Sequence, residues 1–320
     1  MNKLQKLKLL SDLYGWKYLF LKTEDKLLGG DRAAAYGDER IVNADKSEYP
    51  RLLKALYKLH TGEVLNLDDP RSFNEKIQWL KLYDSTPMKT RLSDKYLVRD
   101  WVAEKIGEEY LIPLLGVWDS FDEIDFDTLP DQFALKCNHG SGMNEVVKDK
   151  ASMNKAALKQ KFDKWMATDY SIWGLELQYR DIPRKIIAEQ YINIISEYQY
   201  YCFNGKPLFI SCIIEPHGKN EKETVSLDFQ SLDFVTSAPA ATKSFSPPPF
   251  LQLMNIKAQT LCYNFPFVRV DFISTESCFL FNEMTFTPAN GEIKWEPKYY
   301  DTLIGQYLQL QQQNNSDGAS

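Results

Sequence analysis

A chain of 320 residues with a formal net charge of −6 is long enough for two or three subdomains, each burying a core, and lacks the basic balance of a general nucleic-acid binder. Its five scattered cysteines form no C-x-x-C pair, and its three histidines lie far apart. These features argue against a disulfide framework and against a zinc or histidine metal site. No apolar run reaches the roughly 18 residues that a membrane span requires.

The amino-terminal stretch combines lysines with many leucines, as signal peptides do. Asp12 and Lys17 interrupt its apolar residues, however, and no small-residue cleavage site follows. We therefore predict an amphipathic helix in a cytoplasmic protein, with peripheral contact with the inner face of a membrane as the alternative. A Gly-rich, charged connector (LLGGDRAAAYGDER) is expected at residues 27–40.

Residues 48–108 place apolar side chains at three- and four-residue steps, a spacing typical of helices that bury one face. The predicted helices are YPRLLKALYKLH, SFNEKIQWLKLYD and SDKYLVRDWVAEKIG. Ser72 and Ser93 stand where N-caps are expected, because a serine side chain can accept a hydrogen bond from a first-turn N–H group.

Short apolar runs separated by turn residues begin near residue 110 and predict strands. They are YLIPLLGVW, QFALKCN, NEVVKD, KIIAEQYI, YQYYCFN and PLFISCII. Asn204-Gly205, between the last two, is a strong hairpin signal. Helices are expected near 154–167, 249–263 and 297–310, and a disordered tail at 311–320. The pattern indicates an α+β chain with antiparallel hairpins.

Residues 133–147 (FALKCNHGSGMNEVV) join a strand that carries Lys136 to a Gly-Ser-Gly loop and a second strand. A lysine here can neutralise phosphate oxygens, and small loop residues let backbone N–H groups approach them. The alternative is a surface hairpin with a solvated lysine. Cys137 should point away from Lys136 and belong to the core. No Walker A motif occurs.

Two consecutive strands near residues 268–288 would each present one carboxylate, Asp271 and Glu283. Magnesium is often bound by one or two carboxylates together with ATP phosphates. Arg269 lies two residues before Asp271 and therefore faces the same side of its strand, where it could steady a transferring phosphoryl group. A salt-bridged surface patch is the alternative.

Apolar residues flank a single glutamate, Glu189, in residues 186–192, and Glu197 follows before the next strand. This pattern suits a hinge that lines a flat adenine pocket. An exposed glutamate in a two-sided strand would give the same pattern.

Taken together and in order, these motifs resemble the ATP-grasp superfamily, and most closely the TupA-like ATP-grasp amide ligases, named for teichuronopeptide synthesis. The motifs are SDKYLVRDWV, FALKCNHGSGMN, IIAEQYI, YCFNGKP and RVDF…FNEMTFTPANG, and they cover roughly residues 50–310. The resemblance implies an ATP-grasp fold, in which two α+β subdomains clasp ATP, preceded by a helical N-terminal region. The expected divisions are a helical region at 1–108, an ATP-grasp lid subdomain at 109–187, a C-terminal subdomain with the metal site at 188–310 and a tail at 311–320.

The resemblance also implies roles for individual residues. Lys95 and Lys136 would contact the ATP phosphates, with Lys136 and Arg269 acting in catalysis. The other implied ATP contacts are the phosphate loop (His139, Gly140, Ser141, Gly142), the adenine hinge (Glu189, Gln190, Ile192) and the ribose-binding Glu197.

Asp271 and Glu283 match the magnesium ligands of the family. Thr285 stands where the wider superfamily has an asparagine, so the implied third ligand is Thr285, Asn290 or a water molecule.

The implied reaction is amide formation that uses ATP and Mg²⁺. A carboxylate attacks the γ-phosphate to give an acyl phosphate and ADP, and an amine then displaces phosphate. For this family the substrates would be an amino acid and a uronic acid of a bacterial surface polysaccharide, as a small molecule or linked to a lipid. The polar residues 214–246 would line the substrate pocket or form a solvated loop and hairpin.

Other classes of protein fit parts of the sequence. Asp125-Phe126-Asp127 is a D-x-D string, as in glycosyltransferases, but it lies in an acidic run typical of a solvated turn. An ATP-grasp kinase would use the same lysines and acids and stop at a phosphorylated product. A non-catalytic polysaccharide-binding module would need exposed aromatic residues. The oligomeric state is left open.

Overall fold

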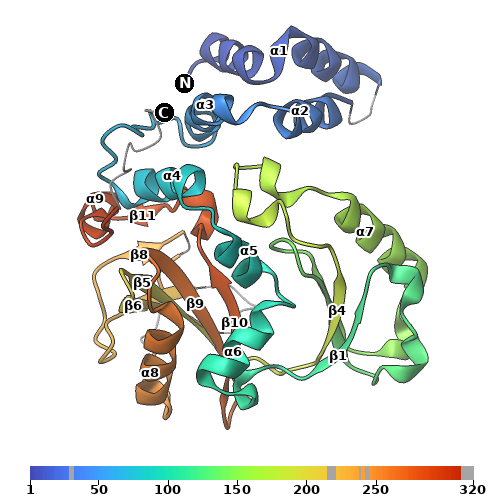
Figure 1. The fold of residues 1–320 in the computed structure, drawn as a ribbon, viewed down its shortest axis with the longest axis vertical. Coiled ribbons are helices and arrows are strands. Elements are labelled where there is room, and N and C mark those ends of the chain that lie inside the picture. The colour runs from blue at the N-terminus through green and yellow to red at the C-terminus, as the bar shows by residue number, and fades with distance from the viewer. Residues whose placement is uncertain (29–31, 215–220, 238, 242–244, 311–320) are drawn as a thin grey trace, which may run out of the picture.

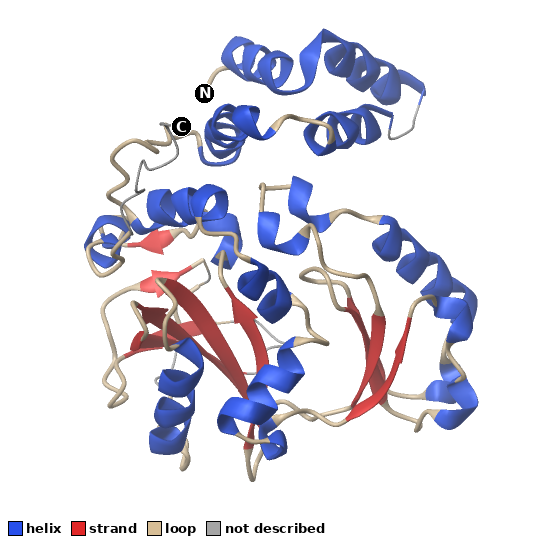
Figure 2. Ribbon diagram, in the orientation of Figure 1, coloured by secondary structure: helices blue, strands red, loops and turns tan. Residues whose placement is uncertain are grey.

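Two antiparallel sheets stand side by side, with helices on their outer faces and a layer of helices beyond one end (Figures 1 and 2). The computed structural model describes residues 1–28, 32–214, 221–237, 239–241 and 245–310, so the predicted tail at 311–320 lies outside the described residues. Among the described helices, none is long and apolar enough to span a membrane.

The N-terminal helices form the outermost layer. They are α1 (Lys3–Leu28), α2 (Arg32–Val42) and α3 (Tyr49–Thr61). The prediction of a connector at 27–40 is wrong from Arg32 onward, where α2 forms. Its alanines favour helix, and Gly37 lets the helix approach the rings of Tyr14 and Tyr18, which a Cβ atom would meet at 3.3 Å.

Helices α4 (Phe73–Tyr83), α5 (Pro87–Ser93) and α6 (Val98–Ile106) lead into the sheets. Ser72 caps α4 as predicted, in a reciprocal capping box with Glu75. The prediction that Ser93 caps a helix is wrong, because Ser93 is the last residue of α5 and α6 begins only at Val98. The Asp94 carboxylate accepts hydrogen bonds from the N–H groups of the intervening turn instead.

The smaller sheet has the strand order β1-β4-β2-β3. Its members are β1 (Leu114–Trp118), β2 (Phe133–Cys137), β3 (Asn144–Val147) and β4 (Ile186–Gln190), and α7 (Lys155–Ala167) packs on one face. Phe133, Leu135 and Cys137 point into that core. The core placement of Cys137 is therefore confirmed, and burial raises the pKa of its thiol to about 12.

The larger sheet has the order β10-β9-β5-β6-β7. Its strands are β5 (Ser196–Phe203), β6 (Lys206–Ile214), β7 (Lys222–Val225), β9 (Phe267–Ser274) and β10 (Phe279–Thr285). The predicted hairpin is confirmed, since Asn204 and Gly205 have φ values of 48° and 74° between β5 and β6. Positive φ at both turn residues matches the twist of the flanking strands.

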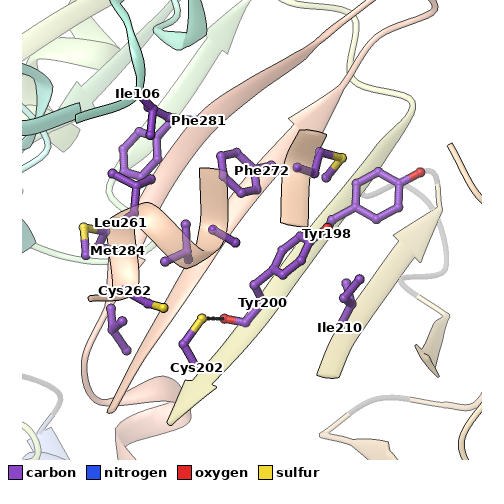
Figure 3. Close-up of a cluster of buried hydrophobic side chains, with 14 of the residues drawn as sticks. Ile106, Tyr198, Tyr200, Cys202, Ile210, Leu261, Cys262, Phe272, Phe281 and Met284 are labelled. Carbon is purple, nitrogen blue, oxygen red and sulfur yellow. Dashed lines mark hydrogen bonds between the residues drawn. The ribbon is translucent and has the colours of Figure 1, made fainter. Parts of the chain in front are cut away.

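One face of the larger sheet is apolar and is covered by α8 (Leu251–Cys262) and α6. Figure 3 shows alternate residues of neighbouring strands pointing into this core, among them Tyr200, Phe272 and Met284, which share the core with Leu261 of α8. At one end of the opposite face, α4 and α9 (Tyr300–Gly305) pack with a two-stranded sheet of β8 (Val235–Thr236) and β11 (Trp295–Glu296). A small apolar cluster that includes Ile273 and Leu280 lies at the other end, and the face between them is polar.

Short 3-10 helices complete the described part of the chain. They are η1 (Lys46–Glu48), η2 (Glu108–Tyr110), η3 (Phe121–Glu123), η4 (Phe126–Thr128), η5 (Lys150–Ser152), η6 (Tyr170–Ile172), η7 (Leu177–Tyr179) and η8 (Pro288–Gly291).

Candidate active site

The predicted metal-binding carboxylates lie side by side on the polar face of the larger sheet. Asp271 on β9 pairs directly with Glu283 on β10, and residues that pair across antiparallel strands share a face. A β-bulge between Phe281 and Glu283 creates this pairing. Without the extra residue, Asn282 would stand opposite Asp271, so the bulge turns Glu283 toward the site.

Arg269 lies beside the two carboxylates, as predicted from the strand alternation. Its guanidinium donates to Asp271 at 2.8 Å (Nε to Oδ1) and 2.5 Å (Nη2 to Oδ2), and to Glu283 Oε1 and Thr285 Oγ1 at 3.3 Å each. The Thr285 hydroxyl donates to Glu283 Oε1 at 3.2 Å. All four predicted residues of this group therefore lie in one cluster.

The two carboxylates differ in their affinity for protons. Burial raises the pKa of Asp271 to about 7, although Arg269 opposes the shift. Lys95 is the main cause that lowers the pKa of Glu283 to about 2. Glu283 is therefore an anion at neutral pH, whereas Asp271 requires nearby positive charge to remain one.

The cluster can hold a divalent cation only with help from other oxygens. No group of three or more His, Cys, Asp or Glu side chains suited to a metal ion occurs in the described part of the chain. The donors present are hard oxygens, two carboxylates and a hydroxyl, which suit magnesium completed by phosphate oxygens and water. The residues present therefore fit a magnesium ion that arrives with a phosphate ligand.

The two predicted lysines approach from different elements. Lys95 lies in the turn before α6, and its Nζ atom is 3.1 Å from Glu283 Oε2. Lys136, on β2 of the smaller sheet, lies 2.7 Å from Glu189 Oε2 on the neighbouring β4. Arg99 of α6 holds the other oxygen of Glu189 at 3.1 Å.

The turn that carries Lys95 connects the two sheets. Its backbone N–H donates to Asn138 O at 3.1 Å, and the Asn138 amide donates to Asp94 at 2.9 Å. Asn138 directly follows β2, while the Lys95 side chain reaches β10. One short segment therefore ties the end of the Lys136 strand to the carboxylate cluster.

The predicted phosphate loop divides into buried and exposed residues. His139 is buried, and its Nε2 lies 3.2 Å from Trp165 O, so the ring belongs to the core under α7. A Cβ atom at Gly140 would lie 2.8 Å from the Tyr170 ring, which leaves no room for a side chain. Ser141 and Gly142 are exposed, so these two residues are the ones able to meet a ligand.

The predicted hinge lies between the sheets. Ile192 packs in a small apolar cluster with Ile112, Ile273 and Leu280, and Ile273 pairs with Glu197 across β9 and β5. An apolar patch and an acidic side chain are thus adjacent. The Gln190 N–H donates to Pro113 O at 2.9 Å and is already satisfied.

Two side chains on the same polar face were not predicted. Lys222 on β7 donates to Gln199 Oε1 at 3.3 Å, and Gln199 donates to Glu197 at 2.8 Å. Burial, with Arg269 contributing, lowers the pKa of Lys222. The alternation in KETV hints at a strand, but its place beside β6 depends on long-range pairing.

Other residues considered from the sequence lie elsewhere. The Asn290 Oδ1 atom accepts a hydrogen bond at 2.5 Å from the buried Lys81, so Asn290 supports the loop after β10 and does not join the carboxylates. Asp125 accepts from the Asp127 N–H at 3.0 Å as the cap of η4, and both side chains are exposed. The D-x-D string is therefore a solvated turn.

The sequence of this chain matches a known family. The model of the TupA-like ATPgrasp family matches residues 75–309, which is most of the chain. The chain belongs to this family. The ATP-grasp fold class predicted from the motifs is thereby confirmed, and the family match includes every predicted site residue, from Lys95 to Thr285.

Solved structures of several ligases are also similar to this chain, at low sequence identity. D-alanine–D-alanine ligase from Bacillus anthracis in complex with ATP shares 14% identity at a TM-score of 0.36, with 65% of this chain and 55% of that chain covered. L-amino acid ligase from Bacillus licheniformis shares 13% at 0.44, with 77% and 58% covered. D-Alanine–D-alanine ligase from Helicobacter pylori shares 18% at 0.40, with 74% and 69% covered.

The chain thus spans little more than half the length of the first two of these ligases. At such TM-scores they add nothing to the family assignment. The comparison with curated proteins yields no match.

Proposed function

We propose that this protein is an ATP-dependent carboxylate–amine ligase that forms an amide through an acyl phosphate. The observation that carries the proposal is the cluster of Arg269, Asp271 and Glu283 with Lys95, tied to the strand of Lys136, in a chain of an ATP-grasp family. In phosphoryl transfer the protein mainly positions the reactants and neutralises the charge on the phosphate. This cluster has the groups for both.

ATP would lie between the two sheets. Lys95, Lys136 and Lys222 would contact its phosphates, and Ser141 and Gly142 would cover them. The patch formed by Ile192 and Ile273 would receive the adenine ring, and the neighbouring Glu197 would accept hydrogen bonds from the ribose hydroxyls.

Asp271 and Glu283 would hold magnesium, with Thr285 contributing its hydroxyl oxygen. When bound, the ion would neutralise and polarise the phosphate oxygens. Arg269 and Lys95, which now neutralise the two carboxylates, would then be released in part to contact the phosphates.

In the reaction, a substrate carboxylate attacks the γ-phosphorus and ADP leaves, which gives an acyl phosphate. An amine then attacks the acyl carbon and phosphate departs. Arg269 would stabilise the negative charge on the phosphoryl oxygens during transfer. No protein nucleophile is required, and Cys137, Cys202, Cys212 and Cys262 are all buried.

The proposed substrates are an amino acid and a uronic acid of a bacterial surface polysaccharide, on the strength of the family alone. The described residues of 221–246 lie at the open edge of the larger sheet, around β7 and β8. Their position supports a role in receiving the acceptor.

The test is to measure ADP release with carboxylate–amine pairs in the presence of hydroxylamine, which converts an acyl phosphate to a hydroxamate. The wild type should release ADP in an amount equal to the sum of amide and hydroxamate, and Lys136→Ala should form none of these products. ADP release with a phosphorylated hydroxyl group and no hydroxamate would make the protein a kinase. Binding of a nucleotide sugar in place of ATP would make it a glycosyltransferase.

A further inference from the structure

Helix α1 lies at the outer edge of the molecule, far from both sheets (Figure 1). Its inner side packs on α2 and α3 through the buried side chains of Leu10 and Leu13. The helix precedes residues 75–309, the part of the chain that the family model matches. The outer side of α1 therefore lies away from the proposed ATP site and outside the part of the chain that the family model matches.

The outer side of α1 exposes large apolar side chains in a regular order. Gly15 adopts φ 79° and ψ 167° and kinks the helix, which divides it into two halves. In the second half Trp16, Phe20 and Leu27 are 78%, 65% and 78% exposed. Positions spaced by 4 and 11 residues fall on one side of a helix with 3.6 residues per turn, so the three side chains form a single stripe.

The first half of α1 also exposes apolar side chains on one side, but only two of them. Leu4 and Leu7, three residues apart and therefore on one side of the helix, are 79% and 42% exposed. Single exposed apolar residues are common, but an ordered stripe with an aromatic pair marks an interaction surface.

The exposed charges of α1 are mainly positive. The helix carries six lysines against three acidic residues, a net charge of +3 in a chain whose net charge is −6. All six lysines are exposed. The Asp25 carboxylate turns toward α2, where it accepts the Ala33 N–H at 2.7 Å.

We infer that α1 docks this protein on a membrane surface rich in anionic lipid, lying in the plane of the interface. Trp16, Phe20 and Leu27 would enter the boundary between head groups and acyl chains, and the flanking lysines would contact anionic head groups. Lysine side chains suit this position because their stems cover apolar surface while the ammonium groups reach outward. A second copy of α1 is a poorer partner, since two surfaces of charge +3 repel each other.

The experiment is co-sedimentation of the full chain with vesicles of phosphatidylcholine and phosphatidylglycerol, and with vesicles of phosphatidylcholine alone. The wild type should bind the anionic vesicles, bind the neutral ones at least about tenfold more weakly, and lose affinity as salt is added. Equal binding to both kinds of vesicle, or no binding to either, would overturn the inference.

Matched variants identify the surface responsible. Trp16→Ser/Phe20→Ser should weaken binding to anionic vesicles by at least about tenfold, because each ring loses its burial in lipid. Lys8→Gln/Lys26→Gln, which removes two exposed lysines that flank the apolar side chains, should weaken it as well, and more at low salt than at high salt. The control Trp173→Ser removes an aromatic side chain that is 55% exposed outside α1, and Lys148→Gln/Lys164→Gln removes two exposed lysines of the smaller-sheet region. Both controls should bind as the wild type does.

Two further measurements keep the interpretation unambiguous. ATP-dependent turnover in solution should be unchanged in Trp16→Ser/Phe20→Ser, and unchanged circular dichroism would exclude misfolding as the cause of lost binding. Wild-type binding by Trp16→Ser/Phe20→Ser would refute the proposed surface. A wild-type dimer that this variant converts to a monomer, without any lipid binding, would show that the stripe faces a second copy.

Discussion

The two faces of the five-stranded sheet are made by alternate residues of the same strands, yet at Phe272 and Asp271 they differ in polarity and charge. Phe272 points into the aromatic core under α8, where it meets Tyr200 and Phe279 edge to face. Its neighbour Asp271 points to the other face, fully buried against Arg269. One face therefore stabilises the fold, whereas the other keeps buried charges that an apolar core would avoid. Such an arrangement is expected where charge serves chemistry.

The largest effect on stability should come from the apolar face. Phe272→Ala should lower the free energy of unfolding by about 3–5 kcal/mol, because it removes a buried ring and leaves a cavity. Urea denaturation measures the loss, and turnover per folded molecule should stay within a few-fold of the wild type. A loss below about 1 kcal/mol would show that this face does not dominate stability.

Substitution of the neighbouring residue, Asp271, should have a large effect on turnover and a smaller effect on stability. Asp271→Asn should lower ATP turnover at least about a hundredfold, because a neutral amide cannot replace a carboxylate beside a divalent cation. Its unfolding midpoint should fall less than that of Phe272→Ala, since Arg269 keeps Glu283 and Thr285 as partners. The exposed Asp163→Asn is the control. Wild-type turnover by Asp271→Asn would remove the carboxylate cluster from the mechanism.

A further buried charge, that of Lys81, lies beside the loop after β10. Lys81 donates to Gly174 O at 2.9 Å and to Asn290 O at 2.8 Å, and burial lowers its pKa to about 8. Between this value and the ordinary 10.5, the unfolded chain binds more protons than the folded one, so the contribution of Lys81 to stability rises with pH by about 1 kcal/mol per unit.

The difference in unfolding free energy between the wild type and Lys81→Met should therefore increase from pH 8 upward. Chemical denaturation at a series of pH values measures it. Parallel stability curves for the two proteins would contradict the lowered pKa.

The smallest effect is expected at the edge of the cluster. Thr285→Val keeps the side-chain volume but removes the hydroxyl that donates to Glu283. Turnover should fall by about three- to tenfold, in line with the loss of one hydrogen bond of about 1 kcal/mol, and more magnesium should be needed for half-maximal rate. Thr285→Ser should restore both values, which a purely structural role for the methyl group would not allow.

Local patterns in the sequence predicted what depends on local contacts. The Asn204-Gly205 turn and the Ser72 cap are set by neighbouring residues, and both were predicted correctly. Arg269 and Asp271 needed only strand alternation to be placed together. The Glu283 side chain needed more, because alternation from Phe281 would turn it into the core, and only the bulge reverses this.

What the sequence could not predict depends on distant partners. Lys222 joins the site through a strand whose position follows from pairing with β6. The sequence predicted Ser93 as a helix cap. In the structure the turn that follows Ser93 is held by hydrogen bonds to Asn138, a residue distant in sequence. Asn290 is held by Lys81, a residue more than 200 positions earlier in the chain. Residue types and spacing contain no information about such contacts.

The most direct test of the central claim is calorimetric titration of ATP, with and without magnesium, into the wild type, Lys136→Ala and the control Lys148→Ala, which removes an exposed lysine just beyond β3. We predict magnesium-dependent binding that Lys148→Ala retains and Lys136→Ala loses by at least about a hundredfold, as expected for a buried charge contact to phosphate. ATP binding that is absent from the wild type, or equal in Lys136→Ala, would contradict an ATP site between the two sheets.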